Sequence, residues 1–126
     1  MVRAAGLAWV SGQIVVDGAN VVSPGTVDRE VPSDVARDLC RRAVLQALSA
    51  LQHELGSLEA VRRIVRVGVF VAVSPGFHRE HEVANGATDL LLEVFGEAGR
   101  ASRTTVGVAG LPLNAPVEVE LLVEAP

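Results

Sequence analysis

The sequence predicts an α+β protein in which one mixed sheet is covered on one face by two helices. Apolar residues recur at helical spacing in two long segments, residues 33–55 and 78–98, and a β-branched segment lies between them at residues 61–73. Shorter apolar segments at both ends of the chain predict paired strands, which gives the order ββαβαββ. An amphipathic helix has to bury its apolar stripe, and a sheet provides the surface for that.

The N-terminal strands are expected within residues 6–22, where the run DGAN at residues 17–20 predicts a tight turn. We expect Ser33 or Asp34 to cap the first helix, because their side-chain oxygens can accept the free N–H groups of its first turn. Gly56 is expected to end this helix, since glycine adopts the left-handed conformation that closes many helices.

The central segment, residues 61–73, predicts the longest strand. Alternation places one set of side chains on each face, with Val65, Val67, Val69, Val71 and Val73 on one and Ile64, Arg66, Gly68, Phe70 and Ala72 on the other. The chain closes with a strand, a Pro-containing turn and a final strand, residues 102–123. Because two helices cover only one face of such a sheet, we expect self-association to cover the other face.

The composition predicts one domain, residues 1–126, with a core of Val, Leu, Ile and Ala, because the chain has one Trp, three Phe and no Tyr. The formal net charge is -4, and all eleven basic residues are Arg. Nucleic-acid binding draws much of its affinity from phosphate neutralisation, so this composition argues against a nucleic-acid partner.

Neither a metal site nor a membrane segment is expected. Cys40 is the single cysteine, and His53, His78 and His81 show no ligand spacing. No apolar run reaches the roughly 18 residues of a membrane span, and no leader-like segment opens the chain. We therefore expect a cytoplasmic protein.

The segment SRTTVGVAGLPLNAPVEVELLV, residues 102–123, places three charges in predicted strands: Arg103, Glu118 and Glu120. Strand interiors rarely hold charge unless the group is paired or binds something. A guanidinium can clamp a carboxylate with two hydrogen bonds, and a half-buried carboxylate can transfer protons. The structural alternatives are an edge-strand arginine with an exposed head and a Val-Glu alternation that simply faces water.

Four segments resemble, in order, the landmarks of the RidA (YjgF) family: WVSGQIVV, VRRIVRVGVFV, ANGATDLLLEVFGE and the segment from residue 102 onward. The resemblance runs from Gly6 to Glu124. Its most specific part is the C-terminal segment, with an Arg-Thr step, a Leu-Pro step and the run Val-Glu-Val-Glu. The variants NGATDLLLEVFG and LPLNAPVEVE are similar to one RidA-like subgroup.

This resemblance implies a chorismate-mutase-like fold and a barrel-like homotrimer with clefts between subunits. It implies an enamine/imine deaminase, which hydrolyses intermediates such as 2-aminoacrylate to 2-keto acids and ammonia, without a metal or an organic cofactor. The expected partners are thus a small enamine, imine or 2-keto acid and two further copies of the chain. Such an activity could serve general metabolite repair or one dedicated pathway.

The resemblance also implies roles for single residues. Arg103 matches the arginine that holds the substrate carboxylate, and Glu118 matches the glutamate that positions water and relays protons. Asn85 matches an asparagine near the cleft, with an exposed helix position as the alternative. Thr105 stands where many members have cysteine, so a thiol mechanism is not expected, and its backbone carbonyl could hold a water.

Ser11 and Gly12 match the S-G-Q landmark, where a backbone N–H meets the substrate carboxylate; an ordinary bulge or turn is the alternative for Gly12. Glu120 is either a partner of Glu118 or a bystander. Two departures bear on substrate choice: the chain begins ten residues before Ser11 and has no Tyr for the cleft, and it reads A-S-R-T where the family usually has P-A-R-S.

Two other functions stay open. A ligand-binding or regulatory trimer would hold a 2-keto acid on Arg103 without turnover. Endoribonuclease or translation-inhibitor activity is a label used in this family, against which the acidic charge, the missing Lys and the scarcity of aromatic residues argue. A chorismate mutase would rest on the fold alone, which does not establish a function.

Overall fold

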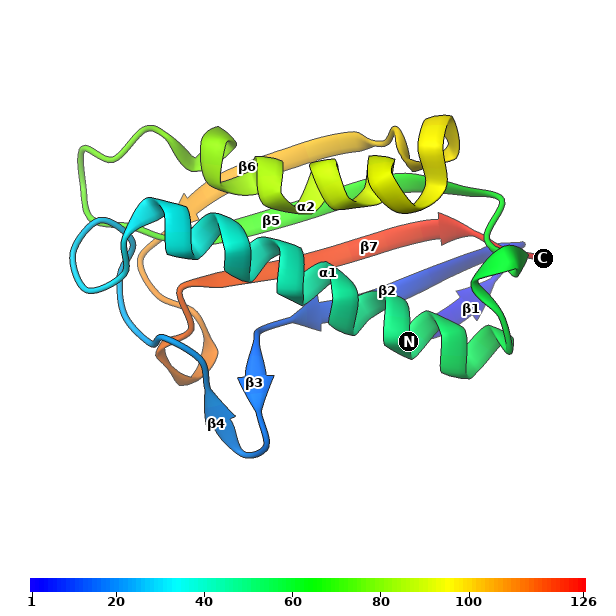
Figure 1. The fold of residues 1–126 in the computed structure, drawn as a ribbon, viewed down its shortest axis with the longest axis horizontal. Helices are drawn as coiled ribbons and strands as arrows, with labels where there is room; N and C mark the ends of the chain where they lie inside the picture. Colours follow the sequence, from blue (N-terminus) through cyan, green and yellow to red (C-terminus); the bar gives the residue numbers. More distant parts are fainter.

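Five strands form one mixed sheet, and two helices lie side by side on one of its faces (Figure 1). The computed structural model describes all residues of the chain, 1–126. The main elements follow in chain order: β1 (Val2–Ala4), β2 (Leu7–Gln13), β3 (Val16–Asp17), β4 (Asn20–Val21), α1 (Ser33–Leu55), β5 (Arg63–Ala72), α2 (Glu80–Phe95), β6 (Ser102–Val108) and β7 (Val117–Glu124). Short 3-10 turns lie at Leu58–Ala60, Gly96–Gly99 and Pro112–Asn114.

The sheet has the strand order β1-β2-β7-β5-β6, so β6 is an edge strand. Its pairing with β5 is parallel, whereas the other pairs of this sheet are antiparallel. Parallel neighbours need a crossover connection, and α2 supplies it. The same helix that joins β5 to β6 therefore also lies beside β6 along its length.

The core lies between the sheet and the helices. β7 shows the pattern most clearly, because Val117, Val119, Leu121 and Val123 are all buried and alternate with half-buried residues. In Figure 1, α1 lies across β7 and β2, while α2 lies across β5 and β6. Each helix buries one stripe of residues against the sheet, as their spacing predicted.

The opposite face of the sheet carries no helix, and we call it the open face. Trp9 of β2 and Val106 of β6 are 48% and 41% exposed there. Phe70 of β5 pairs with Val106 on one side and with Glu118 of β7 on the other, so an aromatic ring lies between an apolar and a charged neighbour. The face is thus partly apolar and partly charged.

The predicted α+β class and the order of the main elements are confirmed. Gly56 ends α1 with a left-handed backbone (φ 84°), as expected. The capping residue differs from the prediction, because Pro32 and not Ser33 or Asp34 occupies the capping position of α1. Asp34 lies in the first turn instead, where its Oδ1 accepts a hydrogen bond from the N–H of Val35 at 2.9 Å. α2 is shorter than predicted, because the chain tightens into a 3-10 turn after Phe95.

Two details of the strands also differ from the prediction. β1 was not expected; it pairs with β2 through a turn in which Ala5 and Gly6 both have positive φ. In β5 the pairing register shifts between Ile64 and Arg66, so Ile64 is buried on the helix face together with Val67. Strict alternation had placed Ile64 on the opposite face, and the irregularity is the reason that it failed.

Candidate functional site

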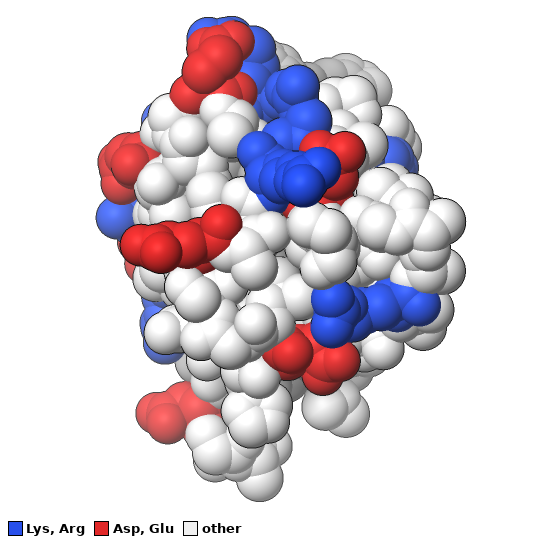
Figure 2. Space-filling model, turned by 90° about the vertical axis from the view of Figure 1, so that its right-hand side faces the viewer, with Lys and Arg blue, Asp and Glu red and all other residues white.

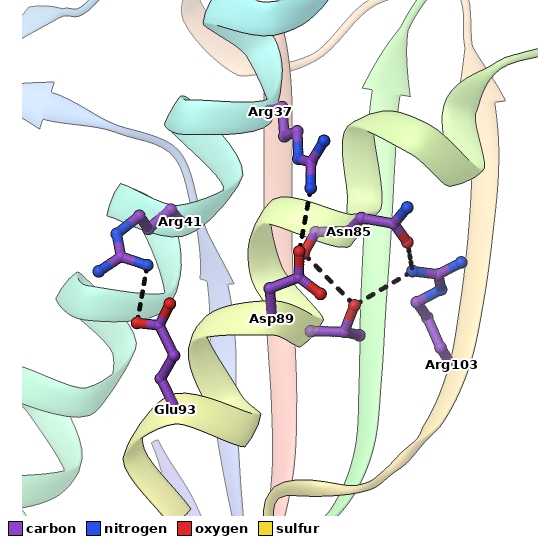
Figure 3. A network of polar contacts seen from close by, with 7 residues as sticks. Arg37, Arg41, Asn85, Asp89, Glu93 and Arg103 are labelled. Carbon is purple, nitrogen blue, oxygen red and sulfur yellow. Dashed lines mark hydrogen bonds and ion pairs between the residues drawn. The ribbon is translucent and has the colours of Figure 1, made fainter.

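Arg103 lies on the edge strand β6 and is held by side chains of α2. Its Nη1 donates hydrogen bonds to Asn85 Oδ1 at 2.8 Å and to Thr88 Oγ1 at 3.2 Å (Figure 3). We call Arg103, Asn85 and Thr88 the arginine group. The guanidinium forms no ion pair, so both of its side-chain partners are neutral.

The fold explains why these three residues meet. Arg103 pairs in register with the buried Val67 of β5, so its side chain leaves the sheet on the helix side. Asn85 and Thr88 are three residues apart on α2 and therefore share a face of that helix. A guanidinium has five donors, and neutral partners fix its orientation without cancelling its charge. The arrangement leaves Arg103 able to bind an anion.

Ion pairs between the two helices lie beside the arginine group. Arg37 of α1 meets Asp89 of α2 at 3.0 Å, and Arg41 meets Glu93 at 3.1 Å (Figure 3). All four side chains are largely exposed, so each pair contributes little to stability. They join α1 to α2, the helix from which Asn85 and Thr88 reach Arg103, whose position is set by its buried stripe.

The charge of Arg103 also affects the pKa of a buried side chain, Cys40 of α1. Burial raises the pKa of the Cys40 thiol from its ordinary 9.0 to about 12, and the nearby Arg103 charge lowers that pKa in part. The thiol is therefore neutral at working pH. A neutral, fully buried thiol is a poor nucleophile, and Cys40 packs as a small member of the hydrophobic core.

Glu118 of β7 lies on the open face, close to Gly12. A Cβ atom placed on Gly12 would come within 2.5 Å of Glu118 Oε2, so only glycine fits beside the carboxylate as it stands. Ser11 and Gly12 lie where the pairing of β2 with β7 shifts register, between Val10 and Gln13. We call Glu118, Gly12 and Ser11 the glutamate group.

The Glu118 carboxylate makes no hydrogen bond and no ion pair, although the residue is half-buried. Glu120, two residues further along the same face, differs in this respect. Its Oε1 lies 3.0 Å from Arg66 Nη1, so its charge is balanced by a neighbour on β5. Of the two carboxylates, Glu118 is the one without a partner in the chain, whereas Glu120 is paired with Arg66.

The structure brings the predicted residues together in two sets and not in one. Asn85 lies against Arg103, and Thr105 is the next residue of β6 on the same face. Gly12 lies beside Glu118, and Ser11 precedes Gly12 in β2. The two sets belong to opposite faces of the sheet, because Arg103 pairs with the helix-facing Val67 while Glu118 pairs with the open-face Phe70.

Thr88 was missed by the sequence reasoning. The available signal was its position three residues after Asn85, which puts both side chains on one face of a helix. Thr105 carries a further oddity, because its Oγ1 is buried and has no hydrogen-bond partner. The chain has no group of three or more His, Cys, Asp or Glu side chains placed to hold a metal ion. None of its helices has the length and apolarity that crossing a membrane requires.

Comparison with known proteins places the chain in a family. Residues 5–125 match the family model described as "YjgF/chorismate_mutase-like, putative endoribonuclease". Protein TCP17 of Trypanosoma cruzi is 43% identical over 116 residues, which cover 91% of this chain and 72% of that protein.

Solved structures agree with this match. Protein Atu1372 of Agrobacterium tumefaciens, whose function is given as unknown, is 35% identical with a TM-score of 0.95, over 99% of this chain and 79% of that one. A protein of Shewanella oneidensis MR-1 described as a "putative endoribonuclease" is 29% identical with a TM-score of 0.93, over 98% and 82% of the two chains. The chain therefore belongs to the YjgF/chorismate mutase-like family, as its motifs predicted.

Proposed function

We propose that the protein is an enamine/imine deaminase, which hydrolyses 2-aminoacrylate-type intermediates to 2-keto acids and ammonia. The observation that carries the proposal is the arginine group: an arginine at the sheet edge, oriented by two neutral partners and free of any carboxylate. A planar guanidinium with free donors is suited to a carboxylate, the group common to these substrates.

The chemistry needs a second group, and Glu118 is our candidate. 2-Aminoacrylate, CH2=C(NH2)–COO⁻, takes a proton at its methylene carbon and becomes the imine of pyruvate. Water then adds to C2, the C–N bond breaks, and pyruvate and ammonia leave, so one water is consumed for each ammonia released. A carboxylate that removes a proton from the water and returns one to the leaving nitrogen accelerates such a reaction. Glu118 has no internal partner that would compete for this role.

The two groups lie on opposite faces, so a small substrate cannot touch both within one chain. We propose that a cleft between two copies joins the arginine group of one subunit to the glutamate group of the next. The partly apolar open face supports this arrangement, because Trp9 and Val106 are left exposed on it in the single chain. A closed ring of three copies satisfies every such interface.

Two rival functions remain to be tested. RNA cleavage is suggested by the description of the family and of the Shewanella relative. Against it, the net charge is -4, and the face in Figure 2 carries separate basic groups interspersed with acidic ones, without a continuous basic track. Ligand binding without turnover would need only the arginine group.

The test measures pyruvate formation from 2-aminoacrylate, generated by a pyridoxal-phosphate-dependent serine dehydratase, in competition with semicarbazide. We expect the wild type to divert the intermediate from semicarbazone to pyruvate, and Arg103→Ala to lose this effect. Arg42→Ala is the matched control, because Arg42 is exposed on α1 and forms no ion pair. A correctly folded wild type without any acceleration would leave ligand binding as the better function.

Mixing two inactive variants tests the cleft. Arg103→Ala and Glu118→Gln subunits, unfolded together and refolded as a mixture, should regain activity, since some clefts receive an intact arginine group and an intact glutamate group. Random assembly makes about a quarter of the clefts complete. No recovery in a refolded mixture that has the wild-type mass by light scattering would contradict a shared cleft.

A further inference from the structure

Two glutamine side chains, Gln13 of β2 and Gln46 of α1, form a series of hydrogen bonds that ends at the glutamate group. Gln46 Nε2 donates to the backbone oxygen of Ile14 at 2.8 Å and to Gln13 Oε1 at 3.4 Å. Gln13 Nε2 donates in turn to the backbone oxygen of Ser11 at 3.0 Å. The series therefore joins a helix to the residue that precedes Gly12, and we call Gln13 and Gln46 the glutamine relay.

The relay contacts an irregular part of β2. Two residues, Ser11 and Gly12, lie opposite the single residue Glu120 of β7, because the pairing of the two strands shifts there. Such a bulge disrupts the hydrogen-bond ladder locally, so its backbone depends on other partners for a fixed conformation. Gly12 lies beside the Glu118 carboxylate. Movement of the bulge therefore changes the space beside Glu118.

Gln13 reaches α1 because its side chain leaves the sheet on the helix side. Its partner in β7 is Val119, which is buried beneath the helices. α1 passes over the end of β2, and Gln46 meets Gln13 there (Figure 1). Gly12 precedes Gln13 in the strand and lies beside Glu118 on the open face. A contact on the helix side can thus fix the position of a residue on the opposite face.

The backbone determines which way both amides point. The N–H of Val16 lies 3.1 Å from Gln46 Oε1 and can only donate, so the nitrogen of Gln46 faces the Ile14 oxygen. That nitrogen has two N–H groups, and the second one points to Gln13 Oε1. The nitrogen of Gln13 is then left for the backbone oxygen of Ser11. Each amide is therefore fixed in one orientation, and neither glutamine bonds to a charged group.

We propose that Gln13 and Gln46 are positioning residues of the glutamate group. Through the backbone oxygen of Ser11 they hold the bulge in the conformation that leaves space beside Glu118. This inference rests on the proposed imine hydrolysis and adds two residues from the helix side of the sheet to its machinery. Neither glutamine touches the substrate, because both act through the backbone of the bulge. A purely structural bond between α1 and β2 is the alternative, and it would change stability alone.

The first test is the steady-state kinetics of Gln13→Met on an imine generated by an L-amino-acid oxidase. This change removes the bond to Ser11 and leaves the two bonds of Gln46 to the backbone of residues 14–16 in place. We expect kcat to fall by about 3- to 10-fold, the factor that corresponds to one lost hydrogen bond. KM should stay within about twofold of the wild type, because the arginine group is unchanged.

Gln46→Leu should lower kcat by a similar factor, although residue 46 lies on a helix and not in the glutamate group. Gln52→Leu is the matched control, because Gln52 is an exposed amide of the same helix, and it should keep the wild-type constants. Thermal unfolding of each variant measures stability separately. A lower melting temperature with wild-type kcat in both relay variants would assign them the purely structural role and overturn the inference.

A second measurement observes the bulge itself and needs no turnover. In ¹H–¹⁵N spectra of the folded protein, the amide signals of Ser11 and Gly12 should shift in Gln46→Leu and stay in place in Gln52→Leu. Unshifted Ser11 and Gly12 signals in Gln46→Leu would overturn the relay. Shifted signals in a protein whose wild type hydrolyses no imine would support the relay and count against the proposed function alone.

Gln46→Glu separates the relay from the bond to Val16. At pH 8 the new carboxylate still accepts the N–H of Val16, but it cannot donate to Gln13 or to the backbone oxygen of Ile14. We expect the same shifted amide signals and lowered kcat as in Gln46→Leu. Wild-type kcat and signals in Gln46→Glu would show that the bond to Val16 alone holds the bulge, and would overturn the role of Gln13.

Discussion

The arginine group and the glutamate group are built in opposite ways. Arg103 is fixed by hydrogen bonds to Asn85 and Thr88, both from the helix beside it. The Glu118 carboxylate has no hydrogen bond or ion pair, and the space beside it is left by the absence of a side chain on Gly12. The first group is oriented before any ligand arrives, whereas the second provides room for something that comes from outside.

This difference suggests a division of labour. A group that recognises a carboxylate benefits from a fixed geometry, because hydrogen bonds to a rigid fork are directional. A carboxylate that exchanges protons with a water molecule needs free space beside its oxygen atoms, so that the water can reach them. Substitutions in each group test whether the two differ in this way.

Glu118→Gln should have the largest effect. We expect kcat to fall by roughly 100- to 10,000-fold with little change in KM, because an amide cannot take a proton from water. Steady-state kinetics on an oxidase-generated imine separates the two constants. Glu120→Gln removes an equal charge that is paired with Arg66, and should stay within about twofold of the wild type. A larger loss in Glu120→Gln than in Glu118→Gln would assign the carboxylates the other way round.

Asn85 probes the arginine group without touching Arg103. Asn85→Ala removes the 2.8 Å hydrogen bond and should raise KM by about tenfold. Asn85→Asp keeps the shape but supplies an internal carboxylate that competes with the substrate, so KM should rise by about 100-fold. Equal KM values for the two variants would show that the neutrality of the Arg103 partners is unimportant.

Gly12→Ala tests whether the Glu118 carboxylate needs the space that Gly12 leaves beside it. Its methyl group would lie 2.5 Å from Glu118 Oε2 and must displace the carboxylate, so we expect kcat to fall by about 10- to 100-fold. The same change in a Glu118→Gln background should add much less, since the displaced group is already inactive. Full additivity of the two changes would argue that Gly12 acts independently of Glu118.

Cys40 links the arginine group to stability. Its pKa is about 12 in the folded protein and ordinarily 9.0, so its contribution to stability is complete below pH 9 and is lost as the pH rises towards 12. The chain contains no Lys and no Tyr, which makes Cys40 the main side chain that titrates in this range. Urea unfolding from pH 8 to 10.5 should show a falling free energy of unfolding. Cys40→Ala should flatten that decline, and an equally steep decline in this variant would assign it to another group.

Much of the fold could be predicted from the spacing of apolar residues and from the glycine and proline residues that end helices and strands. The amphipathic spacing predicted α1 and α2, and Gly56 ends α1 where expected. β1 was missed because its three residues are all exposed and show no alternation of apolar and polar side chains. It is a strand only because the turn after it folds the chain back and pairs it with β2. The face of Ile64 was wrong because a register shift leaves no mark in the composition of β5.

The candidate site was predictable by residue but not by arrangement. Arg103 and Glu118 stand out as charges in apolar strands, yet their faces depend on which residue of β5 each one pairs with. The pattern of one strand shows which residues share a face, but not which residue of the neighbouring strand each one pairs with.

The edge position of β6 couples recognition to local unfolding. β6 pairs only with β5, so in the single chain it can detach while β1, β2, β7 and β5 remain one sheet. Opening of that edge would carry Arg103 away from Asn85 and Thr88 and erase the anion site without global unfolding. An anion bound to Arg103 therefore stabilises the closed edge of the sheet. Hydrogen exchange of the β6 amides should slow as the fraction of protein with bound anion rises.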